Sequence, residues 1–214
     1  MSARTEILDR MGRALRDRPA HPGVPREYRG PGELDVADQV GLFTERLEDY
    51  RASARRCPPG EVAAAVARCL AGQQIERVVV PDGFPAVWLQ TIGAAVVRDS
   101  PQLSADDLDG LDGVVTTCAV AVALTGTIVL DAGPGQGRRA LTLIPDFHLV
   151  VVRSEQIVAG VPDAVRALDG TRPLTWISGP SATSDIELSR VEGVHGPRRL
   201  EVLIVDSGKR GQRA

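Results

Sequence analysis

The chain has 214 residues, of which 25 are basic and 28 acidic, so its formal net charge is only −3. This near balance lacks the excess positive charge of a nucleic-acid-binding surface, and it excludes nucleic acid as an expected partner. The length is sufficient for one large domain with a substantial buried core.

The N-terminal segment predicts a helix followed by an extended arm. Residues 5–16 carry one apolar helical stripe, formed by Ile7, Leu8, Met11 and Leu15. We expect this stripe to dock on the body of the protein, with a second subunit as the alternative. Acidic residues interrupt the segment and it has no apolar core, so it does not resemble a signal peptide. Proline and glycine dominate residues 19–33, which is typical of an extended arm that Tyr28 would anchor.

Two further helices are predicted, at residues 36–54 and 62–70, before the pattern changes. From residue 75 onward, short apolar runs alternate with helical or loop segments. Several runs lack polar alternation, which is typical of strands that are buried on both faces of a parallel sheet. The predicted strands are residues 75–80, 94–97, 113–117, 127–131, 147–152, 174–178 and 200–206, with a helical segment at 84–92.

These elements predict an α/β fold with a largely parallel sheet flanked by helices and with an N-terminal helical extension. We divide the chain into residues 1–72, the helices and arm, and residues 73–208, the α/β domain. Ligands of such sheets bind at the carboxyl ends of the strands, so we expect the loops there to form the site. The longest apolar run, 119–130, is too short to cross a bilayer, and no membrane span is predicted.

The three cysteines, Cys57, Cys69 and Cys118, lie far apart and form no C-x-x-C pair. The usual sequence patterns of iron–sulfur clusters and structural zinc sites are therefore missing. No dinucleotide-binding pattern is present either, so we predict that the chain carries no cofactor. An odd number of cysteines without a secretory segment indicates reduced thiols and a cytoplasmic protein.

Residues 175–197 predict a strand, a turn at Gly179 and Pro180, and the capped start of a helix rich in hydroxyl and acidic side chains. Free N–H groups in a first helical turn can hold a carboxylate or phosphate, so this turn predicts an anion against the amides of residues 181–183. A simple helix cap is the alternative.

A glycine-rich loop precedes two adjacent arginines, Arg138 and Arg139. The loop has neither the G-K-[ST] of a P-loop nor the G-x-G-x-x-G of a dinucleotide site, so a flexible turn is the first interpretation of its glycines. A guanidinium beside such a turn can still hold an anion through two parallel hydrogen bonds.

Two of the three histidines are candidate site residues. His148 lies inside an apolar strand, where a lone histidine is usually a hydrogen-bonded core residue, and His195 lies in a Gly-Pro loop. Neither a metal site with Asp185 and Glu187 nor a triad of Ser181, His195 and Asp185 has the spacing that would favour it.

Four ordered motifs resemble the lactate-utilisation protein C family, whose domain is called the LUD domain. They are T-G-T at 125–127, R-A-L-T-L-I-P-D-F-H-L-V-V-V at 139–152, G-P-S-A-T-S-D-I-E at 179–187 and G-V-H-G-P at 193–197. The resemblance covers roughly residues 75–206, with a looser match at 21–28. Four motifs in order are far more specific than one glycine-rich loop.

The resemblance implies a fold similar to the sugar-isomerase and coenzyme A-transferase proteins. It also implies a role in oxidising L-lactate to pyruvate beside iron–sulfur partner proteins, with a small carboxylate or phosphate as ligand. Related sequences commonly read A-E-T-G-T, whereas this chain has Leu124 in place of the acid. No catalytic residue is assigned, and the candidate ligand-binding residues are Thr125, Gly126, Thr127, Arg139, His148, Gly179, Pro180, Ser181, Thr183, Asp185, Glu187 and His195.

Two functional hypotheses follow. The first is a non-redox accessory component of a lactate-oxidising system, which binds a small anion or organises its iron–sulfur partners. The second is a free-standing isomerase or acyl-transfer enzyme that acts on a phosphorylated or coenzyme A-linked substrate in the same cleft. The second needs a well-placed base or nucleophile, and the sequence shows none.

Overall fold

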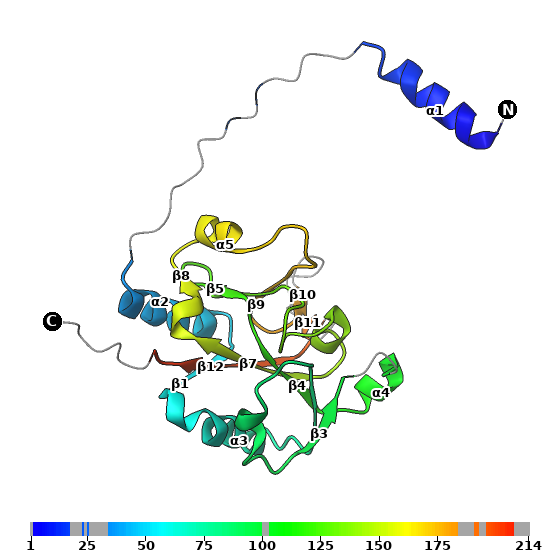
Figure 1. The fold of residues 1–214 in the computed structure, drawn as a ribbon. Helices are drawn as coiled ribbons and strands as arrows, with labels where there is room; N and C mark the ends of the chain where they lie inside the picture. Colours follow the sequence, from blue (N-terminus) through cyan, green and yellow to red (C-terminus); the bar gives the residue numbers. More distant parts are fainter. Residues whose placement is uncertain are drawn as a thin grey trace.

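The computed structural model of the chain describes residues 2–17, 23, 25, 34–99, 103–183, 191–192 and 196–207. Its centre is a six-stranded sheet in which every neighbouring pair of strands is parallel (Figure 1). The strand order is β1-β12-β7-β4-β2-β3. The predicted largely parallel α/β fold is confirmed. The strands are β1 (Ser53–Cys57), β2 (Arg77–Val80), β3 (Ala95–Arg98), β4 (Gly113–Thr117), β7 (Phe147–Arg153) and β12 (Arg199–Val205).

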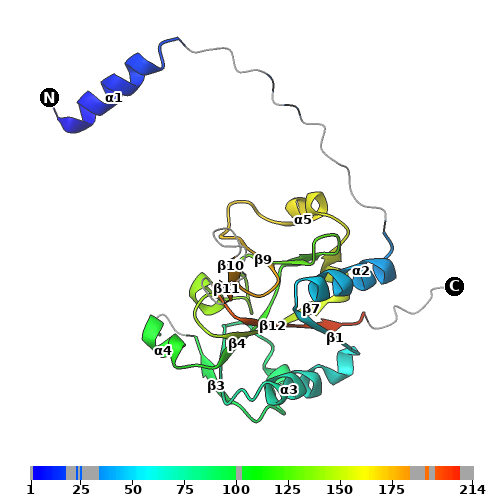
Figure 2. The same ribbon diagram turned by 180° about the vertical axis from the view of Figure 1, so that it is seen from behind.

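Both faces of this sheet are covered (Figures 1 and 2). Helix α3 (Val62–Gly72) and the short 3₁₀ helix η2 (Ala86–Leu89) pack on one face, where Val66 meets Phe147 and Leu203 in a single core cluster. Helix α2 (Val36–Asp49) packs on the other face with a second sheet, and their side chains share a core with Val150 and Val202. This double burial explains the unbroken apolar runs of β7 and β12.

The second sheet has the strand order β8-β5-β6-β9 and was not expected as a separate layer. Its strands are β5 (Val120–Val122), β6 (Thr127–Leu130), β8 (Ile157–Val158) and β9 (Thr175–Ser178), and helix α5 (Val161–Ala167) packs beside it. Strand β6 is antiparallel to both β5 and β9. It is nevertheless buried on both faces, since Ile128 joins the core under α2 while Val129 packs with Ala164 of α5. The apolar runs of the sequence therefore could not show that β6 belongs to a separate sheet.

Helix α1 (Ala3–Ala14) corrects another expectation, because none of its residues is buried. The stripe expected to dock on the body is open to solvent, with Ile7, Leu8, Met11 and Leu15 all more than half exposed. Figure 1 shows α1 apart from the α/β body. Tyr28 lies outside the described residues. No described helix is long and apolar enough to cross a membrane.

The helix predicted at residues 36–54 ends early. It stops at Asp49, Arg51 adopts a left-handed φ of 63°, and β1 follows. Strand β1 was missed because it is an edge strand whose arginines point outward, so its side chains lack an apolar pattern. The helical segment predicted at 84–92 is the shorter η2. Since β1, α2 and α3 share the main core, residues 34–72 pack with the α/β domain, and the boundary at residue 72 stays a prediction.

Two ion pairs hold β1 against the C-terminal strand, and they differ in burial. Glu201 of β12 is 1% exposed, and its carboxylate accepts a hydrogen bond of 2.5 Å from Nε of Arg55. This hydrogen bond raises the pKa of Arg55 above its ordinary value. In the pair between Arg56 and Asp206 both side chains are open to solvent, whereas Glu201 in the first pair is buried. The Arg55 pair is therefore the one whose loss would leave a charge buried.

We predict that Arg55→Ala lowers the free energy of unfolding by about 1–3 kcal/mol, because the buried Glu201 carboxylate loses its charged partner. Arg56→Ala is the matched control and should cost less than about 1 kcal/mol, since its ion pair is exposed. Urea unfolding of the two variants and the parent measures both values. Equal losses in the two variants would contradict a special role for the buried pair.

Remaining described elements are short. They are α4 (Ala105–Asp109), β10 (Ala182–Thr183), β11 (Val191–Glu192) and the 3₁₀ helices η1 (Pro59–Glu61), η3 (Arg139–Thr142) and η4 (Ser154–Gln156).

Candidate functional site

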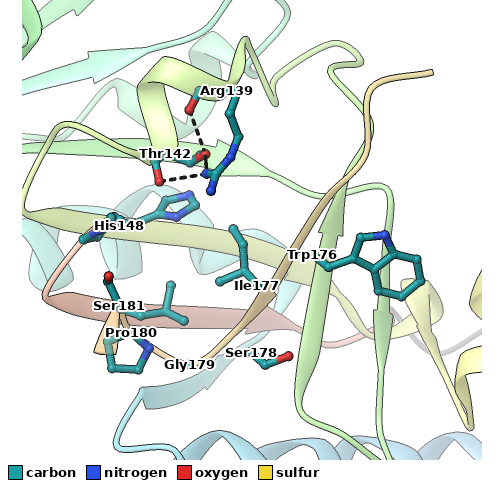
Figure 3. Close-up of a pocket in the computed structure, with 12 residues that line it drawn as sticks. Arg139, Thr142, His148, Trp176, Ile177, Ser178, Gly179, Pro180 and Ser181 are labelled. Carbon is teal, nitrogen blue, oxygen red and sulfur yellow. Dashed lines mark hydrogen bonds between the residues drawn. The ribbon is translucent and has the colours of Figure 1, made fainter. Parts of the chain in front are cut away.

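A cavity of about 230 Å³ lies where the second sheet meets the main sheet. Its floor includes residues near the starts of β7 and β12, η3 covers one side, and the end of β9 with the turn after it forms another (Figure 3). The cavity brings together five of the predicted site residues: Arg139, His148, Gly179, Pro180 and Ser181. The other lining residues are Thr142, Trp176, Ile177, Ser178, Gly196, Pro197 and Leu200.

Arg139 supplies the positive charge of this cavity. Its Nη1 donates hydrogen bonds of 2.8 Å to Oγ1 of Thr142 and 3.2 Å to the carbonyl of Thr142. It forms no ion pair with any acid in the described part of the chain. Partial burial lowers the pKa of Arg139 from its ordinary value, which still leaves a guanidinium charged at neutral pH. An anion in the cavity would therefore meet an unneutralised cation with unused N–H groups.

Arg138, the neighbouring residue, has a different role. Its Nε and Nη2 both donate to the carboxylate of Asp99, and Nη2 also donates to the carbonyl of Leu103. These contacts tie the glycine-rich loop to the segment after β3. The two adjacent arginines thus divide into a structural residue and a candidate ligand-binding residue.

His148 is 1% exposed and forms part of the cavity wall. Its Nε2 lies 2.8 Å from Oγ1 of Thr116, whereas its Nδ1 has no hydrogen-bond partner among the described residues. Burial, with a smaller contribution from the charge of Arg139, lowers the pKa of His148 to about 3. The imidazole is therefore neutral at pH 7 and stays neutral as the pH falls to about 4.

The T-G-T motif forms part of the turn between β5 and β6 and does not line the cavity. Oγ1 of Thr127 lies 2.7 Å from Oγ1 of Thr125 and 2.8 Å from Oγ of Ser178, which does line it. Gly126 has a φ of 60°, and a Cβ there would lie 2.8 Å from Cβ of Arg46. The motif therefore packs the turn against α2 and supports the cavity through Ser178.

The turn after β9 differs from the prediction. Gly179 has a φ of 80° and packs so closely on Tyr50 that a Cβ would lie 2.7 Å from Cβ of Tyr50. The N–H of Ser181 donates to the carbonyl of Pro197 at 2.8 Å, so this amide is already used. Strand β10 follows where a helix was expected, and it pairs with β11. Residues 182 and 183 are therefore extended where the first turn of a helix was expected, and the rest of that expected helix lies outside the described residues.

Other predicted residues lie beyond what the structure describes. Asp185, Glu187 and His195 lie outside the described residues, and so does the side chain of Thr183. Among described side chains, no group of three His, Cys, Asp or Glu residues could hold a metal ion.

The carboxyl edge of the main sheet carries separate cavities. Thr117 and Cys118, at and just after the carboxyl end of β4, line one of about 230 Å³ in which the guanidinium of Arg153 lies 5.7 Å from the centre of the Trp88 ring. His148 is instead the second residue of β7, at the amino end of that strand. The expectation that loops at the carboxyl ends of the main sheet form the site therefore does not hold for the Arg139 cavity, whose floor lies near the amino ends of β7 and β12.

None of the three thiols is suited to nucleophilic chemistry. All three are buried and free, and burial raises the pKa of Cys69 and Cys118 to about 12 and also raises that of Cys57. They are therefore protonated at neutral pH, as expected for thiols in a protein core.

Two hydroxyl residues that line the cavity were not among the predicted site residues: Thr142 and Ser178. Ser178 ends a predicted strand, and Thr142 lies inside the motif that begins at Arg139, so both positions carried a weak signal. Thr116 lies near the carboxyl end of a predicted strand, where ligands were expected, and strand register places it near His148.

Comparisons with known proteins agree on one family. Residues 86–205 match the LUD domain. Lactate utilization protein C of Deinococcus radiodurans is 48% identical over 207 residues, which cover 95% of each chain. A protein of the same name from Geobacillus kaustophilus is 28% identical over 235 residues, covering 93% of this chain and 92% of that one. The crystal structure of a DUF162 family protein from Deinococcus radiodurans superposes with a TM-score of 0.70 at 45% identity, over 80% of this chain and 99% of that chain.

We predict that Arg139→Ala weakens the binding of sulfate or acetate by about tenfold or more, because the cavity loses its charged donor. Its free energy of unfolding should change by less than about 1 kcal/mol, since Arg139 is exposed and forms no ion pair with a described acid. Calorimetric titration and urea unfolding measure the two effects.

Arg138→Ala is the matched control for this test. It should lower stability, because it removes the contacts with Asp99 and Leu103, while anion affinity stays within a factor of about two. A marked loss of stability in Arg139→Ala with unchanged anion affinity would show that the site is misplaced.

Proposed function

Because this chain belongs to the LUD domain family, we propose that it is a non-redox component of a lactate-utilisation system and that it binds a small carboxylate in the Arg139 cavity. The relatives named lactate utilization protein C support the first part of this proposal. We further propose that it works beside iron–sulfur proteins, which supply the redox chemistry that its own residues lack.

The observation that carries the proposal is the unneutralised guanidinium of Arg139 beside a neutral imidazole (Figure 3). A second cation in the cavity would favour multiply charged ligands, whereas the one arginine among the described lining residues matches a ligand with one negative charge. The volume of about 230 Å³ suits an acid of a few carbon atoms.

The described residues favour binding over turnover. A general base must accept a proton near neutral pH, and the pKa of about 3 for His148 makes it a poor base. The cysteine thiols are protonated and buried, so they do not serve as nucleophiles. Leu124, half exposed in the turn between β5 and β6, stands where related sequences commonly carry an acid. These features support the accessory component over an acyl-transfer enzyme.

The proposal is tested by growth on lactate. Deletion of the gene from its source organism should abolish growth on L-lactate and leave growth on succinate unchanged. The parent gene and Arg138→Ala should restore growth, whereas Arg139→Ala should not, because Arg139 lines the cavity and Arg138 does not. Normal growth of the deletion strain on L-lactate would refute a role in lactate utilisation.

We also predict that the purified chain is colourless and does not oxidise L-lactate with an artificial electron acceptor. The sequence has no cluster pattern and no dinucleotide-binding pattern, and electron transfer would fall to partner proteins. Absorption spectra and iron analysis of protein prepared without oxygen provide the measurement. A visible band with stoichiometric iron or flavin would contradict the prediction.

A further inference from the structure

We propose that His148 presents Nδ1–H as a fixed hydrogen-bond donor to the ligand, so that the cavity selects a carboxylate whose neighbouring carbon carries an oxygen. This inference rests on the proposed function of the cavity as a carboxylate site. It adds a residue that determines specificity and a class of ligand, namely 2-oxo and 2-hydroxy acids as opposed to 2-amino acids.

The position of the proton follows from the surroundings of Thr116. Thr116 is fully buried, and its hydroxyl has a single described hydrogen-bond partner, Nε2 of His148, at 2.8 Å. If Nε2 donated to this hydroxyl, the hydroxyl hydrogen would be left without an acceptor in the core. If the hydroxyl donates to Nε2, its hydrogen is satisfied and the ring proton lies on Nδ1. The second arrangement leaves fewer buried polar groups without a partner.

The charge of Arg139 would favour the other tautomer, in which the proton lies on Nε2. A cation near the ring favours an unprotonated nitrogen on the side that faces it. Arg139 is an exposed side chain, however, and water screens its charge. Thr116 is at 0% exposure, where an unpaired hydroxyl has no water to compensate it. The hydroxyl therefore outweighs the guanidinium in setting the tautomer.

Nδ1 is the one buried side-chain nitrogen or oxygen without a hydrogen-bond partner among the described residues, and it belongs to a wall residue of the cavity. A buried polar atom normally has a hydrogen-bond partner, and a bound ligand would supply that partner here. Arg139 holds the carboxylate, and an oxygen on the next carbon of the ligand then accepts from Nδ1–H. An ammonium at that carbon would face two donors, Nδ1–H and the guanidinium, and is disfavoured.

The tautomer is tested without any ligand. Nitrogen-15 NMR of histidine-labelled protein distinguishes Nδ1–H from Nε2–H rings, and His148→Phe assigns the signal among the three histidines. We expect an Nδ1–H ring that shows no titration between pH 5 and 8, consistent with the pKa of about 3. Thr116→Val removes the hydroxyl donor at similar volume, and it should move the proton toward Nε2. An Nε2–H ring in the parent would overturn the inference whatever the cavity binds.

Selectivity is tested with four acids of similar size: pyruvate, L-lactate, propionate and L-alanine. We expect pyruvate and L-lactate to bind about tenfold more tightly than propionate, which lacks the second oxygen, and L-alanine to bind most weakly. In His148→Phe and Thr116→Val, the advantage of pyruvate over propionate should fall to about twofold or less. Thermal unfolding shows whether either variant fails to fold. If one does, the selectivity of the other variant decides whether His148 has the proposed role.

The two proposals fail in different ways. If none of the four acids binds the parent, the proposed carboxylate site is wrong and this inference fails with it. If the acids bind through Arg139 but pyruvate and propionate bind equally, the carboxylate site stands and the role of His148 is overturned.

Discussion

The burial of β7 and β12 on both faces is the constraint on which the rest of the structure depends. A polar side chain in such a strand has no access to water and must find a partner inside the protein. Two polar side chains in these strands are almost fully buried, His148 and Glu201, and they lie on opposite faces of the sheet. Glu201 is paired with Arg55. His148 is paired only in part, and it faces the side where the cavity forms.

The second sheet completes the cavity beside this partly paired histidine. It places the end of β9 over the face of the main sheet, while η3 brings Arg139 to the same space (Figure 3). The surrounding contacts keep these parts in position: the threonines of T-G-T hold Ser178, Gly179 packs on Tyr50, and Arg138 ties the glycine-rich loop to Asp99. Thr125, Thr127 and Arg138 thus support the residues that line the cavity, while Gly179 both lines it and packs on Tyr50.

The electrostatics of the cavity fit the proposed binding of an anion. Among the described lining residues, one cation lies beside a neutral ring and several hydroxyl groups, and burial keeps both the imidazole and the thiols in their neutral forms at pH 7. Hydrogen-bond donors that do not change their protonation state can hold an anion and orient it. They do not move protons, which agrees with a component that leaves oxidation and reduction to its partners.

The sequence by itself determined the fold class, most strands of the two sheets, and the choice of Arg139, His148 and the Gly179 turn as candidates, because apolar runs and motifs are local properties of a chain. It did not reveal the edge strand β1, because the exposed arginines of β1 interrupt any apolar pattern. It also did not reveal the division into two sheets, because β6 is as apolar as a parallel strand. Only the tertiary structure showed that Arg138 binds Asp99 and that Thr116 pairs with His148. Those roles depend on which residues of distant segments come within hydrogen-bond distance, and strand register and the packing of the two sheets decide that.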